Sequence, residues 1–263
     1  MQEIDFYLVD AFSDKTFGGN AAAVCPLEEW LPDETLLKMA QQHNQSETAF
    51  FVRTDGGFEL RWFTTLDEIN LCGHATLAAS HVIFEYLDYP HTEITFTTRF
   101  VGELTVKRSG DWLTLNFPAW STEVVENPPE VLFSALGITA AKDVRVGRDY
   151  MVVLESQQQV EALTPDIGAM LPLDKMICVT APGDKYDFVS RFFCPGEGVP
   201  EDPVTGSAHS MLIPYWSEKL GKTSLNARQV SHRGGDLRCE LKGDRVLIGG
   251  QATLYLKGRV FLR

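Results

Sequence analysis

Two segments of this chain are apolar on almost every face of the helix that their sequence predicts. They cover residues 75–86 and 208–220. A helix that is hydrophobic all round must be buried on all sides. Most other regular segments of the chain have strand character, so a sheet wrapped around each helix is the natural way to bury it. The pattern therefore predicts an α+β fold built on two central helices.

Strand signals are frequent outside these two helices. Short runs rich in β-branched and aromatic residues are typical of strands, and they occur at residues 6–9, 48–52, 58–63, 94–98, 102–106, 112–117, 150–154, 176–180, 188–193, 245–249 and 252–256. Residues 109–111 and 242–244 have hairpin-like turn sequences. One more helix is predicted over residues 33–43, where acidic side chains suit a helix start.

The chain also repeats its own pattern about half a chain length apart. Each copy has a strand, a loop and a glycine-led buried helix. The first copy contains Arg61-Trp62-Phe63-Thr64 and Cys72-Gly73-His74-Ala75, and the second contains Arg191-Phe192-Phe193-Cys194 and Thr205-Gly206-Ser207-Ala208. Two domains of similar build are predicted, over residues 1–117 and 118–263. The boundary region extends through the turn at residues 127–129, and the last strand has the option of packing back on the first domain.

Charge restricts the partners. The chain has 263 residues with 36 acidic and 23 basic side chains, and its formal net charge is −13. A nucleic-acid partner and an anionic membrane surface both require a basic face, so neither is expected. A small anionic metabolite remains a suitable partner, provided that a local positive device binds it against the overall field.

The cysteines and the N-terminus favour a cytoplasmic protein. The cysteines are odd in number and form no C-x-x-C pair; they are Cys25, Cys72, Cys178, Cys194 and Cys239. This usage fits reduced thiols better than a disulfide framework. The N-terminus lacks a secretory signal, and no apolar stretch approaches the about 18 residues of a membrane span.

The small-residue turn before each buried helix is the strongest candidate site. The turns are Gly73-His74-Ala75-Thr76 and Thr205-Gly206-Ser207-Ala208-His209. Free amides and the positive end of a helix dipole make such a turn an anion site, and glycine lets a ligand approach the backbone. Two such turns could hold one carboxylate between them. The alternative is that each glycine only turns or caps the chain.

Several side chains near these turns could carry acid/base chemistry. Glu47 lies at the edge of an apolar strand, where a carboxylate can act as a general acid/base. Asp202 precedes the second turn and could orient a substrate amine, and His74 could donate to an anion or relay a proton. Cys72 would need a low pKa to act as a nucleophile or base. Each has an ordinary structural alternative: an exposed carboxylate, a turn-forming Asp, a hydrogen-bonded His and a small buried thiol.

The sequence predicts neither a metal nor a cofactor. His74 and His81 would be about 10 Å apart along a helix, which is too far for one ion. Gly18-Gly19-Asn20 lacks the third spaced glycine of a dinucleotide site.

A series of ordered motifs resembles the phenazine-biosynthesis PhzF-like isomerase family. The motifs are Phe17-Gly18-Gly19-Asn20, Ser46-Glu47-Thr48-Ala49-Phe50, Arg61-Trp62-Phe63-Thr64, Cys72-Gly73-His74-Ala75-Thr76-Leu77-Ala78, Asp187-Phe188-Val189-Ser190-Arg191-Phe192, Glu201-Asp202-Pro203-Val204-Thr205-Gly206-Ser207-Ala208-His209 and Gln229-Val230-Ser231-His232-Arg233-Gly234-Gly235. The resemblance covers almost the whole chain. This chain differs at Ala21, where the family commonly has Pro, and at Thr65, where it also commonly has Pro. Both positions lie beside the expected site.

The resemblance implies a diaminopimelate epimerase-like fold of two pseudo-repeated domains, each a curled, mostly antiparallel sheet around a central helix, with the site in the cleft between them. It also implies a cofactor-independent proton shift on a small carboxylated substrate. Glu47 would be the acid/base, assisted by the side chains of His74, Asp202 and Ser207. The implied substrate-binding residues are Gly73, Ala75, Thr205, Gly206 and Asn20. The resemblance further suggests a homodimer.

Two other functions remain open at this point. A racemase or epimerase on the same fold would place one cysteine on each side of the substrate carbon. Cys72 matches the first, but Thr205 stands where the second would be, so one-sided chemistry by Glu47 fits better. A non-catalytic anion-binding or interaction protein would be expected to lose Glu47 or Asp202, and both are present.

Overall fold

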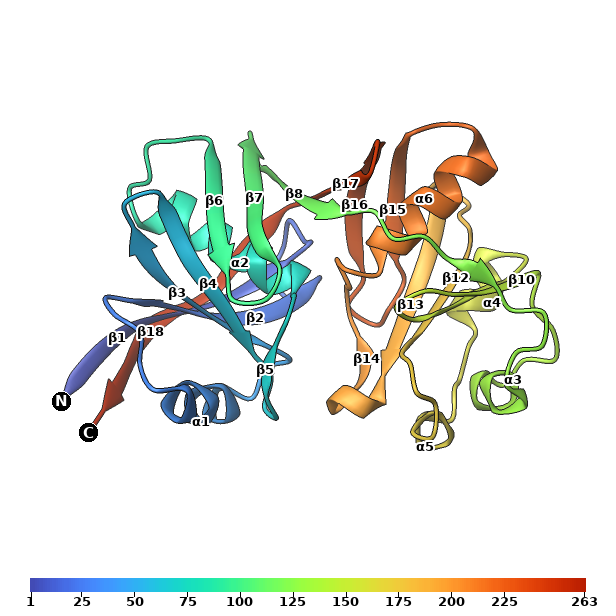
Figure 1. Ribbon diagram of the computed structural model, residues 1–263, viewed down its shortest axis with the longest axis horizontal. Helices are drawn as coiled ribbons and strands as arrows, with labels where there is room; N and C mark the ends of the chain where they lie inside the picture. The colour runs from blue at the N-terminus through green and yellow to red at the C-terminus, as the bar shows by residue number, and fades with distance from the viewer. The chain divides into compact units, whose positions relative to one another are not determined.

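The first and last strands of the chain pair with each other, from Gln2 with Leu262 to Ala11 with Ala252. The computed structural model describes residues 1–263, which divide into two units. Unit 1 contains Met1–Phe117 and Ile248–Arg263, and unit 2 contains Pro118–Leu247. The last strand therefore belongs to unit 1, and the N- and C-termini lie side by side (Figure 1).

Unit 1 is a curled sheet with one helix inside it and one outside. Its elements are β1 (Gln2–Ala11), β2 (Asn20–Leu27), α1 (Asp33–His43), β3 (Thr48–Thr54), β4 (Gly57–Phe63), β5 (Glu68–Ile69), α2 (Gly73–Tyr86), β6 (Glu93–Thr98), β7 (Gly102–Ser109), β8 (Trp112–Pro118) and β18 (Ala252–Leu262). The strand order is β18-β1-β2-β3-β4-β6-β7-β8, with β5 paired to β4. Only β2–β3 and β4–β6 are parallel, so the sheet is mostly antiparallel.

Helix α2 is the enclosed helix of unit 1. It contacts β1, β2, β3 and β18, and Figure 1 shows the strands around it. Only His81, Glu85 and Tyr86 in α2 are not fully buried. Helix α1 lies outside the sheet, where Leu36 and Met39 pack against buried strand side chains. The all-round apolar pattern of α2 and the one-sided pattern of α1 thus match their two environments.

Unit 2 follows the same plan with more short elements. It contains β9 (Glu123–Val124), α3 (Glu130–Leu136), β10 (Asp143–Val146), β11 (Tyr150–Val153), α4 (Gln157–Glu161), α5 (Ile167–Met170), β12 (Ile177–Pro182), β13 (Phe188–Cys194), the 3₁₀ helix η1 (Pro195–Glu197), β14 (Val199–Asp202), α6 (His209–Leu220), β15 (Ser224–Gln229) and β16 (Gly235–Lys242). Strand β17 (Arg245–Gly250) begins in unit 2 and ends in unit 1. Most of α6 is buried, as its sequence predicts. Helices α3, α4 and α5 contribute to a separate apolar cluster with the sheet.

The pairing pattern of the two sheets shows the duplication directly. In unit 1 the successive pairs β1–β2, β2–β3, β3–β4, β4–β6 and β6–β7 are antiparallel, parallel, antiparallel, parallel and antiparallel. In unit 2 the pairs β10–β11, β11–β12, β12–β13, β13–β15 and β15–β16 have the same sequence of directions. Strand β4 therefore corresponds to β13, and β5 corresponds to β14.

An arginine clamp recurs at the same place in both units. Arg61 donates from Nε and Nη2 to Glu68 at 2.7 Å each, and its guanidinium lies 5.1 Å from the ring of Phe63. Arg191 donates in the same way to Glu201 at 2.7 and 2.9 Å, and lies 5.0 Å from the ring of Phe193. Bidentate pairs fix geometry as well as charge. The arginine in each repeated motif is thus a structural brace of the hairpin that precedes the buried helix.

Several elements differ from the sequence prediction. Helix α2 begins two residues earlier than expected, at Gly73, so His74 lies in its first turn. Strands β2, β10, β15 and β16, together with the three short helices of unit 2, have no counterpart in the sequence prediction. No helix of the structure has both the length and the apolar character needed to cross a bilayer.

Candidate functional site

The first turn of α2 forms the floor of the candidate site. Cys72 has an extended backbone (φ −135°, ψ 117°) and caps the helix that Gly73 begins. As at any helix start, the amides of Gly73, His74 and Ala75 have no acceptor within the helix. They lie at the positive end of the helix dipole, so this turn offers donors to an anion.

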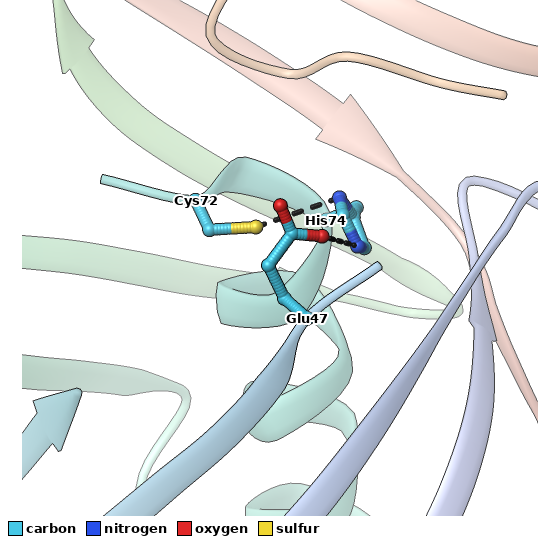
Figure 2. A group of neighbouring side chains, drawn as sticks. All are labelled: Glu47, Cys72 and His74. Carbon is cyan, nitrogen blue, oxygen red and sulfur yellow. Dashed lines mark hydrogen bonds and ion pairs between the residues drawn. The ribbon is translucent and has the colours of Figure 1, made fainter. Parts of the chain in front are cut away.

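Glu47 reaches the same turn from another part of unit 1. It directly precedes β3, and its carbonyl oxygen accepts from the amide of Ala23 in β2, at 3.2 Å. Its side chain is 16% exposed, and Oε2 lies 3.0 Å from Nε2 of His74, which is 3% exposed. Figure 2 shows the carboxylate facing the imidazole. The two atoms are in ion-pair contact without hydrogen-bond alignment, so both are buried without a hydrogen-bond partner.

Asn20 contacts the other nitrogen of the same imidazole. Its Nδ2 lies 3.0 Å from Nδ1 of His74, and both side chains are buried. The preceding loop needs glycine at Gly19, because φ is +61° and a Cβ atom there would lie 2.0 Å from the carbonyl oxygen of Ala11. The motif Phe17-Gly18-Gly19-Asn20 therefore has a structural task, which is to deliver Asn20 to His74.

The electrostatics of this group follow from its burial. Burial and the charge of Glu47 raise the pKa of the Cys72 thiol to about 11, although His74 opposes the shift. Burial alone would lower the pKa of His74, but Cys72 and Glu47 together raise it well above its ordinary value. Because a thiol with so high a pKa is neutral near pH 7, we ascribe the shift of His74 to the carboxylate of Glu47. Glu47 thus faces an imidazolium that retains its proton near pH 7, whereas Cys72 is poorly suited to be a base.

The group also has the composition of a metal-ligand set. One ligand atom each from Glu47, Cys72 and His74 can be chosen so that all three lie within 4.8 Å of one another. From the sequence, His74, His81 and His209 were the candidate metal ligands considered. This set was missed because Glu47 is distant in sequence and Cys72 was considered only as a nucleophile, base or buried thiol.

The second predicted turn lies in unit 2 and is held by Gln229. Asp202, at the end of β14, accepts from the hydroxyl of Thr205 at 2.5 Å. Gln229 is fully buried and accepts from the amide of Thr205 at 2.8 Å. It donates to the carbonyl of Asp202 at 2.6 Å and to the hydroxyl of Thr205 at 3.3 Å. The amide of Thr205 therefore donates to Gln229 and its hydroxyl donates to Asp202. Sequence reasoning quoted Gln229 in a motif but gave it no role.

Gly206 and Ser207 complete the turn before α6. Their carbonyl groups accept from the amides of His209 and Ser210, both at 3.1 Å. His209 is fully buried, and Nδ1 lies 2.8 Å from the carbonyl of Thr205, so this nitrogen carries the proton and donates. Burial lowers the pKa of His209 to about 4 despite that hydrogen bond. It is a neutral structural histidine that fixes the start of the helix.

The sheet registers allow the two units to be compared position by position. Ala49 pairs with Val24 and Trp62, and Cys178 pairs with Met151 and Phe192 in the same way. Counting two residues back along β3 and β12 then matches Glu47 with Met176. Counting four residues back along β2 and β11 matches Asn20 with Gly147.

The same comparison shows which candidate site residues have a counterpart in the other unit. The repeated turns match Cys72 with Thr205 and His74 with Ser207. In unit 2, Asp202 lies opposite Phe192, and at the equivalent position of unit 1 Ile69 lies opposite Trp62. Asp202 thus corresponds to Ile69. The acid/base candidates Glu47 and His74 therefore have no counterpart in unit 2, and Asp202 has none in unit 1.

The structure thus groups the predicted residues by unit. Asn20, Glu47, Gly73, His74 and Ala75 gather at the start of α2. The residues gathered before α6 are Asp202, Thr205, Gly206 and Ser207. That the two turns share one carboxylate ligand stays a prediction.

Comparison with known proteins identifies relatives across the whole chain. The family described as phenazine biosynthesis-like protein matches residues 9–258. An uncharacterized isomerase of Pseudomonas aeruginosa is 48% identical over 261 residues, covering 99% of this chain and 100% of the relative. An uncharacterized isomerase of Halalkalibacterium halodurans is 42% identical over 270 residues, covering all of both chains.

Solved structures agree on the fold. A phenazine biosynthesis protein of the PhzF family from Enterococcus faecalis is 44% identical, with a TM-score of 0.95 over 99% of this chain and 100% of that one. A probable proline racemase from Agrobacterium radiobacter has a TM-score of 0.62 at 11% identity, covering 99% of this chain and 93% of that one. The latter likeness shows only that the epimerase and racemase fold is shared.

Proposed function

Since the chain belongs to the phenazine biosynthesis-like family, we propose that it is an isomerase that moves a proton on a small carboxylated substrate, with Glu47 as general acid and base. Its P. aeruginosa and H. halodurans relatives are named isomerases. The observation that carries the proposal is the buried contact of 3.0 Å between Glu47 and His74 at the start of α2. A carboxylate held there can take a proton from a substrate carbon and return it at another position on the same face.

His74 assists in this scheme as a donor. The carboxylate beside it favours the protonated imidazole, and a half-turn of the Asn20 amide would present an oxygen to the Nδ1 proton. Together with the amides of Gly73 and Ala75, the imidazole would stabilise the negative charge that develops as the substrate proton leaves. No cofactor is needed for such a step, because the proton returns to the same molecule.

Residues of unit 2 would bind the substrate rather than react with it. Asp202 would hold an amine or hydroxyl group, assisted by Ser207, and the turn at Gly206 would offer amides to the substrate carboxylate. We propose that this turn and the one at Gly73 hold the substrate together. A small anionic metabolite fits this arrangement despite the acidic surface, because the amides provide the local positive potential.

A two-base racemase is the weaker alternative. It would need a second acid/base at the equivalent position of unit 2, where Met176 and Thr205 stand. The thiol of Cys72 also has a raised pKa, of about 11, which weakens it as a base. Both observations favour one-sided chemistry by Glu47.

Solvent deuterium reports directly on this mechanism. Small cyclic and acyclic carboxylic acids that bear an amine or hydroxyl would be incubated with the protein in D₂O and followed by proton NMR. The wild-type protein should convert a substrate, and deuterium should enter the new C–H position to the extent that Glu47 exchanges its proton with solvent before it returns it. Glu47→Gln keeps the shape but cannot accept the proton, so it should lose about 10² to 10⁴ in rate while still binding the compound.

A matched substitution controls for the loss of a carboxylate in general. Glu93 is exposed at the start of β6, so Glu93→Gln should react like the wild type. A Glu47→Gln protein that turns substrate over at nearly the wild-type rate would refute the assignment of Glu47.

A further inference from the structure

Glu47, Cys72 and His74 come from two separate segments of unit 1 and present three different kinds of donor atom to one small volume (Figure 2). A carboxylate oxygen, a thiol sulfur and an imidazole nitrogen are all good ligands for Zn²⁺. Hard cations such as Mg²⁺ prefer oxygen ligands alone, so the donor set discriminates between the two classes.

The distances suit one ion. Zinc binds nitrogen and oxygen at about 2.0–2.2 Å, so two such ligands on a tetrahedral ion lie about 3.3 Å apart. Nε2 of His74 and Oε2 of Glu47 are 3.0 Å apart. Sulfur binds at about 2.3 Å, which requires separations of about 3.5 Å from the other ligands. One ligand atom from each side chain can be chosen so that all three lie within 4.8 Å, and Sγ of Cys72 is 3.5 Å from Nδ1 of the same imidazole, so rotation of the side chains would bring the three donors to one ion.

The two closest atoms of the set also lack a hydrogen-bond partner. Oε2 of Glu47 and Nε2 of His74 are both inaccessible and make no aligned hydrogen bond, although buried polar atoms are almost always hydrogen-bonded. A cation that replaces the proton on Nε2 would bind both atoms at once. The lack of hydrogen bonds at these two atoms is a second observation, separate from the residue types in the set, and it also favours a cation as the ligand.

The second nitrogen of His74 has a suitable partner for metal binding. A metal-bound imidazole usually donates its other N–H to an oxygen, which fixes the ring. Asn20 lies 3.0 Å from Nδ1, and its amide can present an oxygen there after a half-turn. The remaining four cysteines are also buried, but Cys72 is the one with a histidine and a carboxylate beside it.

We propose that Glu47, Cys72 and His74 bind one Zn²⁺ or a similarly soft divalent ion, and that this ion inhibits the enzyme. On binding, Cys72 loses its thiol proton and His74 loses the proton on Nε2, both to solvent, and the two coordinate as the thiolate and the neutral imidazole. The fourth position is left to water or to an anion. The claim of inhibition rests on the proposed function, because the ion would occupy the carboxylate that moves the proton. The claim of binding does not.

Cadmium titration tests the binding without any turnover. Cd²⁺ would be added to the metal-free wild-type protein under reducing conditions, and the thiolate-to-metal absorbance in the near ultraviolet would be recorded. We expect the absorbance to saturate at one equivalent, Zn²⁺ to displace Cd²⁺, and a large excess of Mg²⁺ to have no effect. Absence of the band, or saturation only at several equivalents, would overturn the proposal.

Variants assign the ligands. Cys72→Ala should abolish the band, whereas Cys239→Ala, which removes a buried thiol in unit 2, should leave it unchanged. Glu47→Gln should retain the band with affinity lowered at least tenfold. An unchanged band in Cys72→Ala, or unchanged affinity in Glu47→Gln, would refute the ligand set. If Cys72→Ala does not fold, X-ray absorption of the zinc-loaded wild type decides, because one sulfur ligand is required.

Inhibition is read separately from binding. Stoichiometric Zn²⁺ should abolish turnover, and a chelator should restore it. Binding of Cd²⁺ with unchanged turnover would refute the inhibition and would argue against Glu47 as the base. Failure to bind the ion would leave the proposed isomerase mechanism intact.

Discussion

Gln229 provides a quantitative test of what holds the loop before α6 in unit 2. It lies at the end of β15, is fully buried and makes three hydrogen bonds to the loop of Asp202 and Thr205. Gln229→Met keeps the length and approximate volume of the side chain and removes every hydrogen bond. The substitution therefore isolates the polar contribution from packing.

The expected loss can be added from its parts. The amide of Thr205 would be left buried without its acceptor, which costs about 1–3 kcal/mol. Losing the 2.6 Å hydrogen bond to the carbonyl of Asp202 costs about another 1 kcal/mol. The free energy of unfolding of unit 2 should thus fall by about 2–4 kcal/mol. For a unit of this size, about 4 °C per kcal/mol gives a melting temperature lower by roughly 8–16 °C.

The measurement is urea and thermal unfolding followed by far-ultraviolet circular dichroism. Gln159→Met is the matched control, because Gln159 is an exposed residue of the same unit whose side chain accepts one hydrogen bond, from the amide of Glu155 at 2.9 Å. Its effect should stay within about 0.5 kcal/mol. A Gln229→Met protein as stable as this control would show that the clamp does not hold the loop.

Two further predictions concern single side chains. Cys72→Ala should retain most of the turnover of any substrate found, because the thiol has a pKa of about 11; a loss of a hundredfold or more would restore the cysteine mechanism. The lowered pKa of His209, about 4, means that the unfolded chain binds an extra proton between pH 6.5 and 4, so stability should fall by up to roughly 3 kcal/mol as the pH drops through that window. His43 contributes with the same sign, so the test is whether His209→Asn has a flatter pH dependence of the unfolding free energy than the wild type.

The buried helices were the most predictable part of the fold. Their all-round apolar sequence allowed only one kind of environment, and α2 and α6 occupy it. Strand β2 was missed because its run of alanines has no strand character by composition. Ala22 and Ala23 are fully buried in β2, which contacts α2, so small side chains suit this position. Tertiary packing, rather than local preference, decides this segment.

Strand β15 was missed because its buried face has few apolar side chains. In β15, Leu225, Ala227 and Gln229 are buried and alternate with polar residues, so the buried face carries only one strong apolar side chain. The buried Gln229 reads as polar in a sequence pattern, although its hydrogen bonds to the loop compensate its burial. The short helices of unit 2 are too brief to show a helical period.

The sequence predicted candidate acid/base side chains but not their contacts. Glu47 and His74 were both singled out. Their 3.0 Å contact, however, requires that the residue just before β3 lies beside the first turn of α2. The role of Asn20 as the second partner of His74 was equally invisible, because it is set by the tight backbone at Gly19. Such contacts are products of sheet register, which no short motif encodes.

The duplication shows which features the two units share and which positions have diverged between them. Arg61 and Arg191 each make a bidentate pair with a glutamate in the same register, so both units retain the brace of the hairpin before the buried helix. The positions beside the helix starts have diverged instead, with Glu47 matched by Met176 and His74 by Ser207. A symmetric pair of acid/base groups would suit inversion at one carbon, which needs a donor on each side. Under the proposed function, acid/base candidates in one unit alone suit a proton that leaves and returns on one face.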